Sequence, residues 1–327
     1  SLHDALPICT TQALCGAVEE GTAYVSPNKY ATIQRIPTAS LCCEKCQADI
    51  NCGAWTLDTA TQLCSLMGRE PDFSVPTAVR QPNAVAGLPH RALAPRGTLY
   101  CVALMQPGSY EIGLLQMQVG LKISMFACEE SKVYSNTEIE LVPGLRTGVI
   151  ESDLRCGMGG DSGTALNTGI FIAFWKSVID DGRFRFNEWT VKVDPDAVFF
   201  PDRLKAHLQL HADGPAGVYL NNCKYGLHGP IEVFSTKAME TYAAHYQQCQ
   251  QKLWFAASHW GEDMYMDQCL QKVLKVKRDD EFSLICEDHC DCPTFRACNT
   301  GAVTFHPFKT QAGYRQCMAS AGVALPA

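Results

Sequence analysis

Apolar and polar residues alternate with a period of two over residues 189–193, WTVKV, and this pattern predicts a buried β-strand. Pro195 ends the strand because it has no N–H to donate to a neighbour, and Asp194 and Asp196 flank it on a turn. Pro201 then opens a short helix. Two carboxylates therefore follow the carboxyl end of a core strand, where open α/β sheets bind ligands.

Strand and helix patterns alternate over residues 97–318. Apolar residues recur every four positions from Leu166 to Val178, which predicts an amphipathic helix ending at Gly182. Further strands are expected at residues 98–105, 122–128, 217–223 and 302–306, and further helices after Gly108, within residues 226–242 and from Trp260 to about Lys277. This alternation predicts an α/β domain with a doubly wound, mostly parallel sheet.

Residues 9–70 hold seven of the eighteen cysteines and form a separate first unit. Thr38 or Ser40 can cap a short helix on which Cys42 and Cys46 share one face. Two disulfides can therefore pin this helix to neighbouring strands.

Residues 71–96 carry five prolines and little periodicity, so we expect an extended linker there. The first unit holds seven cysteines and the rest of the chain eleven. Both numbers are odd, so either one disulfide joins the two units or each unit keeps a free thiol, with Cys9 the expected unpaired residue of the first.

The composition narrows the possible functions. The chain has 327 residues, a formal net charge of −7 and 46% hydrophobic residues, which suits a globular protein of about two domains and argues against nucleic-acid binding. No apolar stretch approaches the length of a membrane span. Eighteen cysteines favour an oxidising compartment of the secretory pathway, such as the Golgi lumen or the extracellular space. Residues 1–8, SLHDALPI, resemble a translated sequencing adapter, so we expect an N-terminal targeting segment to be missing.

The run LCCEKCQADINCGAWTLDTATQLCSLM resembles the PAN/Apple module, with its Cys-x3-Cys-x5-Cys-x11-Cys spacing. The resemblance covers roughly residues 15–67. It implies a small disulfide-rich α+β domain in which an antiparallel sheet cradles a helix, with Cys42–Cys64 and Cys46–Cys52 as disulfides. It also implies binding of protein or carbohydrate without catalysis. A zinc site is the alternative for these cysteines, although no histidine joins them.

Two other motifs suggest functions that the chain does not support. The stretch 160–163, Gly-Asp-Ser-Gly, resembles the nucleophile loop of trypsin-like proteases, but Ser162 precedes His245, whereas that family places its histidine first. His289, Cys290, Cys292 and Cys298 could bind zinc. Only one residue separates Cys290 from Cys292, which is tight for a chelate, so disulfides are expected there.

Several candidate site residues lie at the ends of elements expected in the second unit: Asp194 and Asp196 after the central strand, Trp260, Glu262 and Asp263 at a helix start, and His306 after the last strand. Through them residues 97–318 resemble the GT-A glycosyltransferases, most nearly the β-1,3-glycosyltransferase and fringe-like group. The matching motifs are WTVKVDPDAVF for the strand with its DxD motif, HGPIEVFSTKAM for the acceptor-side segment, WGEDMYMDQCL for the Glu-Asp-Val helix start and HPFKT for the C-terminal histidine. Pro195 stands where that group commonly has Asp, and Met264 where Val is usual. The resemblance implies a GT-A-like fold, with residues 319–327 as a tail.

This resemblance implies metal-dependent transfer of a sugar from a nucleotide-sugar donor to a hydroxyl of a glycan or glycoprotein. Asp196 would ligate Mn²⁺ or Mg²⁺ directly, Asp194 would hold it through water or contact the ribose, and His306 would complete the protein ligands. Such an ion neutralises the charge that develops on a diphosphate leaving group.

The resemblance also implies inversion at the transferred sugar. Asp263, beside Glu262, would be the base that takes the proton from the acceptor hydroxyl, and Trp260 could stack on a sugar ring. A simpler explanation is that Glu262 and Asp263 complement a helix dipole whose other end carries basic residues, namely Lys275, Lys277 and Arg278.

Simpler explanations exist for the other features as well. Asp-Pro-Asp is a common turn sequence, and His306 could be an ordinary strand-end histidine. The competing class of function is a non-catalytic, glycan-binding protein that combines a PAN module with a degenerate transferase fold. The enzyme hypothesis requires Asp194, Asp196 and His306 to converge on one site.

Overall fold

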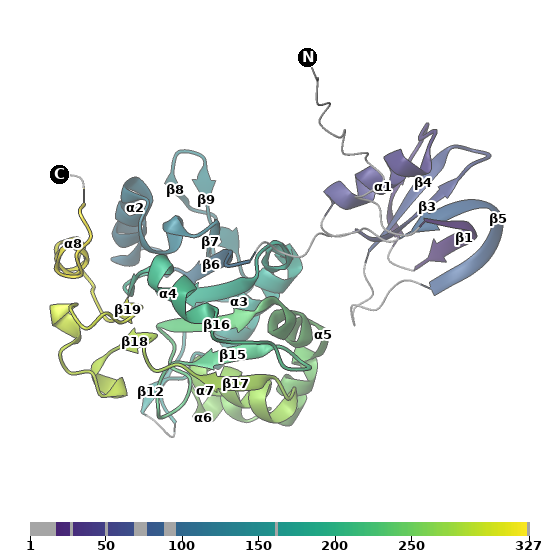
Figure 1. Cartoon of the computed structure of the whole chain (residues 1–327). Coiled ribbons are helices and arrows are strands. Elements are labelled where there is room, and N and C mark those ends of the chain that lie inside the picture. Colours follow the sequence, from purple (N-terminus) through teal and green to yellow (C-terminus); the bar gives the residue numbers. More distant parts are fainter. Residues whose placement is uncertain are drawn as a thin grey trace, which may run out of the picture. The chain divides into compact units, whose positions relative to one another are not determined.

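The computed structural model describes residues 18–26, 29–49, 52–68, 77–87, 96–160 and 163–325. The chain divides into two compact units between Leu93 and Ala94 (Figure 1). The adapter-like residues 1–8, Cys9, and Ser162 of the protease-like motif lie outside the described residues.

The first unit is a five-stranded antiparallel sheet with one helix packed on it, in the strand order β1-β5-β3-β4-β2. The elements are β1 (Val18–Val25), β2 (Lys29–Ile33), α1 (Ala39–Ala48), β3 (Cys52–Asp58), β4 (Leu63–Gly68) and β5 (Thr77–Gly87). Thr38 caps α1 by accepting a hydrogen bond from the backbone N–H of Leu41 at 3.3 Å.

Two disulfides fasten α1 to the sheet and confirm the pairs implied by the PAN resemblance. Cys42 bonds to Cys64 on β4 and Cys46 to Cys52 on β3, with Cα–Cα distances of 5.6 and 5.2 Å. These cysteines are fully buried and belong to the apolar core beneath the helix, together with Trp55. In a unit this small, the cross-links add stability that the limited core cannot supply alone.

The expected linker over residues 71–96 differs from the structure, because β5 occupies residues 77–87 and pairs with both β1 and β3. Proline and polar residues concealed this strand in the sequence. Pro82 is tolerated because it lies where the β1–β5 register shifts, opposite Gly21, and a bulge does not need its missing N–H.

The second unit is built on a seven-stranded sheet with the order β10-β7-β6-β13-β16-β15-β17. Its strands are β6 (Leu99–Leu104), β7 (Glu130–Ser135), β10 (Gly148–Val149), β13 (Trp189–Val193), β15 (Val218–Asn221), β16 (Ile231–Ser235) and β17 (Lys277–Asp280). Only β16 runs against the others, since its pairs with β13 and β15 are antiparallel and the remaining pairs are parallel. The prediction of a mostly parallel α/β sheet is confirmed.

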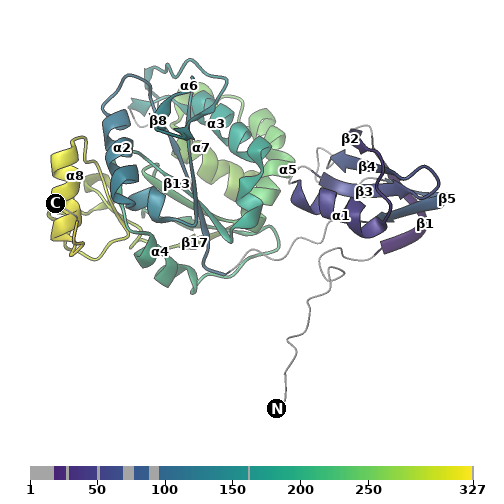
Figure 2. The ribbon, with the colours of Figure 1, turned by 90° about the horizontal axis from the view of Figure 1, so that it is seen from above.

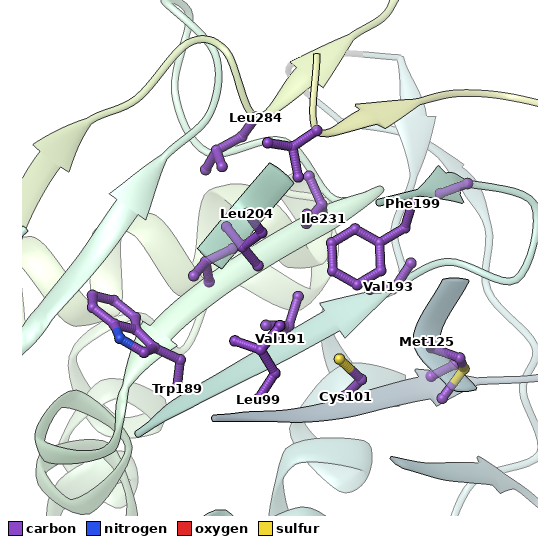
Figure 3. Close-up of a cluster of buried hydrophobic side chains, with 14 of the residues drawn as sticks. Leu99, Cys101, Met125, Trp189, Val191, Val193, Phe199, Leu204, Ile231 and Leu284 are labelled. Carbon is purple, nitrogen blue, oxygen red and sulfur yellow. The ribbon is translucent and has the colours of Figure 1, made fainter. Parts of the chain in front are cut away.

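Helices cover both faces of this sheet (Figure 2). The α-helices are α2 (Glu111–Leu121), α3 (Thr168–Asp181), α4 (Pro201–Leu208), α5 (Thr236–Lys252), α6 (Ala256–His259), α7 (Glu262–Gln268) and α8 (Gln311–Ser320). Trp189, Val191 and Val193 of β13 point to the face covered by α4, where Leu204 packs (Figure 3). Phe171 of α3 lies on the opposite face, with Lys192.

Short elements complete the second unit. They are the strands β8 (Glu140–Val142), β9 (Leu145–Arg146), β11 (Met158–Gly159), β12 (Thr164–Ala165), β14 (Val198–Phe199), β18 (Ile285–Cys286) and β19 (Thr304–Phe305), and the 3₁₀ turns η2 (Ser124–Ala127), η3 (Arg183–Phe186), η5 (Asp288–Cys290) and η6 (Phe295–Ala297). Strands β14, β19 and β18 form a small sheet of their own. Val323 and Leu325 pack against the adjoining apolar cluster, so the expected tail over residues 319–327 is partly in contact with the domain.

Three element predictions need correction. The apolar run 122–128 is not a strand: it forms η2 with Met125 buried, and the strand follows at β7. The segment 226–242 contains the fully buried strand β16 before its helix. The helix expected from Trp260 to Lys277 ends earlier, since α7 continues as one π-helical turn, η4 (Cys269–Val273), and Lys277 begins β17. An apolar run alone does not distinguish a buried strand from a buried helical turn.

Ten of the eleven cysteines in the second unit form disulfides within it: Cys101–Cys128, Cys223–Cys290, Cys249–Cys269, Cys286–Cys292 and Cys298–Cys317. Cys156 is free and exposed. The expectation of disulfides rather than zinc at Cys290, Cys292 and Cys298 is confirmed. Within the described parts of the chain, no helix is both long enough and apolar enough to cross a membrane.

Candidate functional site

The candidate site lies at the carboxyl ends of β6 and β13, which are neighbours in the sheet. From β6 the chain moves to β7 on one side, and β13 lies on the other side, so the strand order reverses between β6 and β13. Such a reversal leaves a crevice outside the carboxyl ends of the strands, where α/β proteins bind ligands. Asp194 follows β13 directly, and the loop after β6 carries Tyr110.

Asp194, Asp196 and His306 converge at this edge of the sheet. One potential ligand atom from each lies within 4.8 Å of the others. His306 Nε2 is 3.2 Å from Asp196 Oδ1, and the Tyr110 hydroxyl donates to Asp196 Oδ2 at 2.8 Å. Burial raises the pKa of Asp196, but the contacts with His306 and Tyr110 outweigh it and leave that pKa below its ordinary value.

The turn that presents these acids is held by buried hydrogen bonds. Gln118 of α2 donates to the Pro195 carbonyl at 2.8 Å, and the backbone N–H of Phe308 donates to the Asp196 carbonyl at 2.8 Å. Asp196 is only 6% exposed. The position of its carboxylate is therefore set by the fold rather than by solvent-exposed rotamers.

Glu287 orients His306 from the other side of its ring. His306 Nδ1 lies 3.1 Å from Glu287 Oε2, so Nε2 faces Asp196. Burial lowers the pKa of His306, but Asp196 and Glu287 raise it to about 9. Burial raises the pKa of Glu287, but His228 and His306 together hold it far below its usual range. A carboxylate behind an imidazole is the arrangement that fixes metal-binding histidines in proteins.

Lys192 lies beneath the acids and is fully buried. Its Nζ is 2.7 Å from Asp194 Oδ1 and 2.9 Å from Glu262 Oε1, and Glu232 faces it across the β13–β16 pair. Burial lowers the pKa of Lys192, but these carboxylates raise it above its ordinary value. Lys192 thus neutralises part of the negative charge that the site concentrates in a low-dielectric environment.

Glu262 and Asp263, adjacent in sequence at the start of α7, point to different places. Glu262 is 5% exposed and turns inward, where its carboxylate pairs with the buried Lys192. Asp263 keeps 28% of its side chain exposed and lies 3.6 Å from His228 Nδ1. Burial raises the pKa of Asp263, yet the contact with His228 and the hydrogen bond from Met264 N leave it below its ordinary value. Asp263 is therefore a partly exposed, ionised carboxylate at neutral pH.

A line of close contacts connects Asp263 to the convergent acids. His228 Nε2 lies 2.9 Å from Glu287 Oε2, which also contacts His306. Contacts therefore run from Asp263 through His228, Glu287 and His306 to Asp196. Trp260, one turn before, packs its ring edge to face on Phe255 with centroids 4.9 Å apart.

The sequence interpretation missed five residues of the site: Tyr110, Glu111, Lys192, His228 and Glu287. Glu111, beside Asp194 and Asp196, has its pKa raised to about 7 by burial and by repulsion from those acids. Glu287 directly follows β18, so its place at the end of a strand was a usable signal. Lys192 occupied a polar position of an amphipathic pattern and gave no sign that it would be buried.

Comparison with known proteins identifies the first unit. Residues 18–88 match the PAN domain family, so the first unit contains a PAN domain. That match covers β1 to β5. The sequence matches no curated protein.

Solved structures similar to the chain include glycosyltransferases. A glycosyltransferase involved in the glycosylation of the major capsid of PBCV-1 is 11% identical, with a TM-score of 0.38 over 69% of this chain and 100% of that one. The glycosyltransferase GlyE of Streptococcus pneumoniae TIGR4 is 12% identical, with a TM-score of 0.34 over 57% of this chain and 47% of GlyE. The apo form of GlyE is 14% identical, with a TM-score of 0.33 over 57% of this chain and 46% of GlyE. The chain thus spans about half the length of GlyE, and these scores do not establish a shared fold.

Proposed function

We propose that residues 94–327 form a metal-dependent glycosyltransferase of GT-A type that moves a sugar from a nucleotide-sugar donor to a hydroxyl of a glycan or glycoprotein. The observation that supports it most is the convergence of Asp194, Asp196 and His306 at the carboxyl end of β13. Two of the fringe-like sequence motifs also lie at ends of elements: the Asp-Pro-Asp turn follows β13, and Glu262-Asp263 opens α7.

The residues present suit a divalent cation. Two carboxylates and one imidazole form a donor set for Mn²⁺ or Mg²⁺, and Glu287 fixes the imidazole from behind. Lys192 takes one oxygen of Asp194, which leaves the other oxygen for the ion or for the ribose. The bound ion supplies positive charge against the diphosphate leaving group.

Asp263 is the proposed base for the acceptor hydroxyl. It is ionised, partly exposed and separated from Asp196 by the contacts through His228, Glu287 and His306. In-line displacement with inversion requires base and leaving group on opposite sides of the sugar, so the proposal places the donor sugar between Asp263 and the ion at Asp196. Glu262 positions the start of α7 through its ion pair with Lys192 instead of touching substrate. Trp260 offers an aromatic face for a sugar ring.

The first unit would select the target. A PAN domain that binds protein or carbohydrate would hold the acceptor glycoprotein while the second unit modifies it. Seven disulfides among the described residues suit the oxidising secretory route, either the Golgi lumen or the extracellular space.

The test is a screen of nucleotide sugars for Mn²⁺-dependent hydrolysis or transfer, with and without EDTA. Asp196→Asn should abolish Mn²⁺-dependent turnover of the accepted donor while the chain still folds, because the amide keeps the size of the carboxylate and can still accept from Tyr110, although the ion pair with His306 is lost. Asp202→Asn, which changes an exposed acid on α4, is the matched control and should keep full activity. Donor binding without turnover in the wild type would favour the non-catalytic, glycan-binding alternative.

A further inference from the structure

A second group of potential metal ligands lies next to the first. His228, Glu287 and His289 each offer one ligand atom within 4.8 Å of the others. His228 Nε2 is 2.9 Å from Glu287 Oε2, and His289 Nδ1 is 3.5 Å from Glu287 Oε1. The two imidazole rings have centroids 6.0 Å apart, and each contacts one oxygen of the Glu287 carboxylate. This group shares no residue with Asp194, Asp196 and His306.

His306 Nδ1, 3.1 Å from Glu287 Oε2, is buried without a hydrogen bond, and so are two atoms at the centre of this group, His228 Nε2 and Glu287 Oε2. They are within ion-pair distance, yet the ring N–H axis does not point at the oxygen as a hydrogen bond requires. Buried polar atoms in native proteins are rarely left in this condition. A cation shared by the imidazole and the carboxylate would satisfy both atoms.

Covalent cross-links hold the three residues in place. Cys286–Cys292 closes the loop that carries Glu287 and His289, and Cys223–Cys290 ties that loop to the segment leading to His228. Asn222 fixes the backbone of His228, since its side chain donates to the His228 carbonyl at 2.7 Å and accepts from its N–H at 2.8 Å. Such preorganisation is what a metal site needs and a casual surface cluster lacks.

We propose that His228, Glu287 and His289 bind a second divalent cation of the zinc class, in addition to the ion proposed at Asp194, Asp196 and His306. Two imidazoles and one carboxylate form a zinc donor set that leaves a fourth position open. The open position faces solvent, since the His289 side chain is 80% exposed. Asp263, 3.6 Å from His228 Nδ1, stands behind the ligand as outer carboxylates do in zinc sites. The inference does not depend on sugar transfer.

Zn²⁺ and Co²⁺ alone are the probes, titrated into the full chain with Cys156 alkylated so that its thiol cannot bind metal. Calorimetry gives the number and affinity of bound Zn²⁺ ions, and the visible spectrum of Co²⁺ reports tetrahedral nitrogen and oxygen ligation. We expect two Zn²⁺ ions in the wild type and one in Asp196→Asn.

His289→Ala is the decisive variant, because His289 is exposed and its loss does not disturb the core. We expect this variant to bind one of the two Zn²⁺ ions at least about 100-fold more weakly, a larger loss of affinity than removal of an outer hydrogen-bond partner causes. The visible bands of tetrahedral Co²⁺ should also disappear. His245→Ala, which alters another exposed histidine on α5, should bind as the wild type does.

Binding in His289→Ala equal to that in His245→Ala would overturn the proposal, and the contacts around Glu287 would then be an ion pair of protonated imidazoles. It is also overturned if Asp196→Asn and His289→Ala remove the same single ion. If His289→Ala loses the second ion but keeps sugar transfer, the two proposals stand independently. If the wild type binds two ions but transfers no sugar, the second metal site stands and the proposed enzymatic function fails.

Discussion

At the scale of single residues, the site is a concentration of carboxylates that the fold makes tolerable by placing donors against each one. Asp194 has Lys192, Asp196 has Tyr110 and His306, and Asp263 has His228. Like charges placed so close would otherwise shift one another toward the protonated form. The pKa values of Asp196 and Asp263 lie below the ordinary value, so both carboxylates stay ionised, which ligation and base catalysis require.

Asp263 provides the most direct test of mechanism. Asp263→Asn preserves shape and removes the proposed base, so the proposed transfer should fall by about 10²–10⁴-fold while donor and Mn²⁺ binding are retained. Transfer kinetics and a donor-binding titration measure the two effects. NMR of the product's anomeric configuration adds a second criterion. Unchanged transfer, or retained configuration, would leave Asp263 as a group that complements the dipole of α7.

Glu111 gives a pH prediction for the metal-free protein. Its folded pKa is raised to about 7 from an ordinary 4.5, so between these values the folded state holds a proton that the unfolded state has lost. The contribution of Glu111 to the free energy of unfolding therefore falls as pH rises from about 4.5 through 7. Glu111→Gln should be progressively more stable than the wild type over that range and constant above it.

Urea unfolding in EDTA at pH 4.5, 6 and 8 measures this difference. Glu138→Gln, at an exposed carboxyl paired only with Arg146, is the control and should show no such trend. A stability difference for Glu111→Gln that is the same at all three pH values would contradict the assignment.

At the scale of elements, β13 carries the architecture and the chemistry on opposite faces. Trp189, Val191 and Val193 fill the core beneath α4, while Lys192 turns to the face of α3 and α7 and meets Glu262. One strand therefore ties the site acids, the start of α7 and the central core together.

Lys192→Met should be strongly destabilising. It leaves Glu262 buried without its cation, and removing one partner of a buried ion pair costs about 3–5 kcal/mol. The exposed pair Lys176–Asp180 on α3 is the control, because Lys176→Met should cost no more than about 1 kcal/mol. Chemical denaturation at pH 7 measures the free energy of unfolding of both variants. An equal decrease in the two would show that Lys192 does not neutralise the buried acids of the site.

The strand and turn at β13 could be predicted because period-two burial and an Asp-Pro-Asp turn are local signals. Strand β16 could not, since residues 231–235 are buried on both faces and run straight into α5 without a turn. Strand β5 was hidden by Pro82, whose tolerance depends on a register shift against β1. In each case the deciding contact came from a strand distant in sequence.

The site shows the same division. Asp194, Asp196 and His306 could be proposed because each ends an element, and elements of one sheet end at a common edge. Glu287 and Lys192 matter through partners about 20 and 70 residues away, His306 and Glu262, which no local pattern specifies. The inward turn of Glu262 likewise depends on Lys192, so sequence could not separate its role from that of Asp263.

At the scale of the whole molecule, the chain consists of two units whose described disulfides each close within one unit. Residues 94–327 hold their own core and five disulfides, so this segment should fold alone when produced in an oxidising compartment. Alkylation without reduction, followed by mass spectrometry, should then label one cysteine, Cys156, and leave the other ten paired.

The isolated segment should also keep the Zn²⁺ and Mn²⁺ binding of the full chain, because every proposed ligand lies within it. Several labelled cysteines, or an unfolded circular dichroism spectrum, would show that the second unit depends on the first for folding, and the PAN domain would then be part of the catalytic scaffold rather than a separate recognition module.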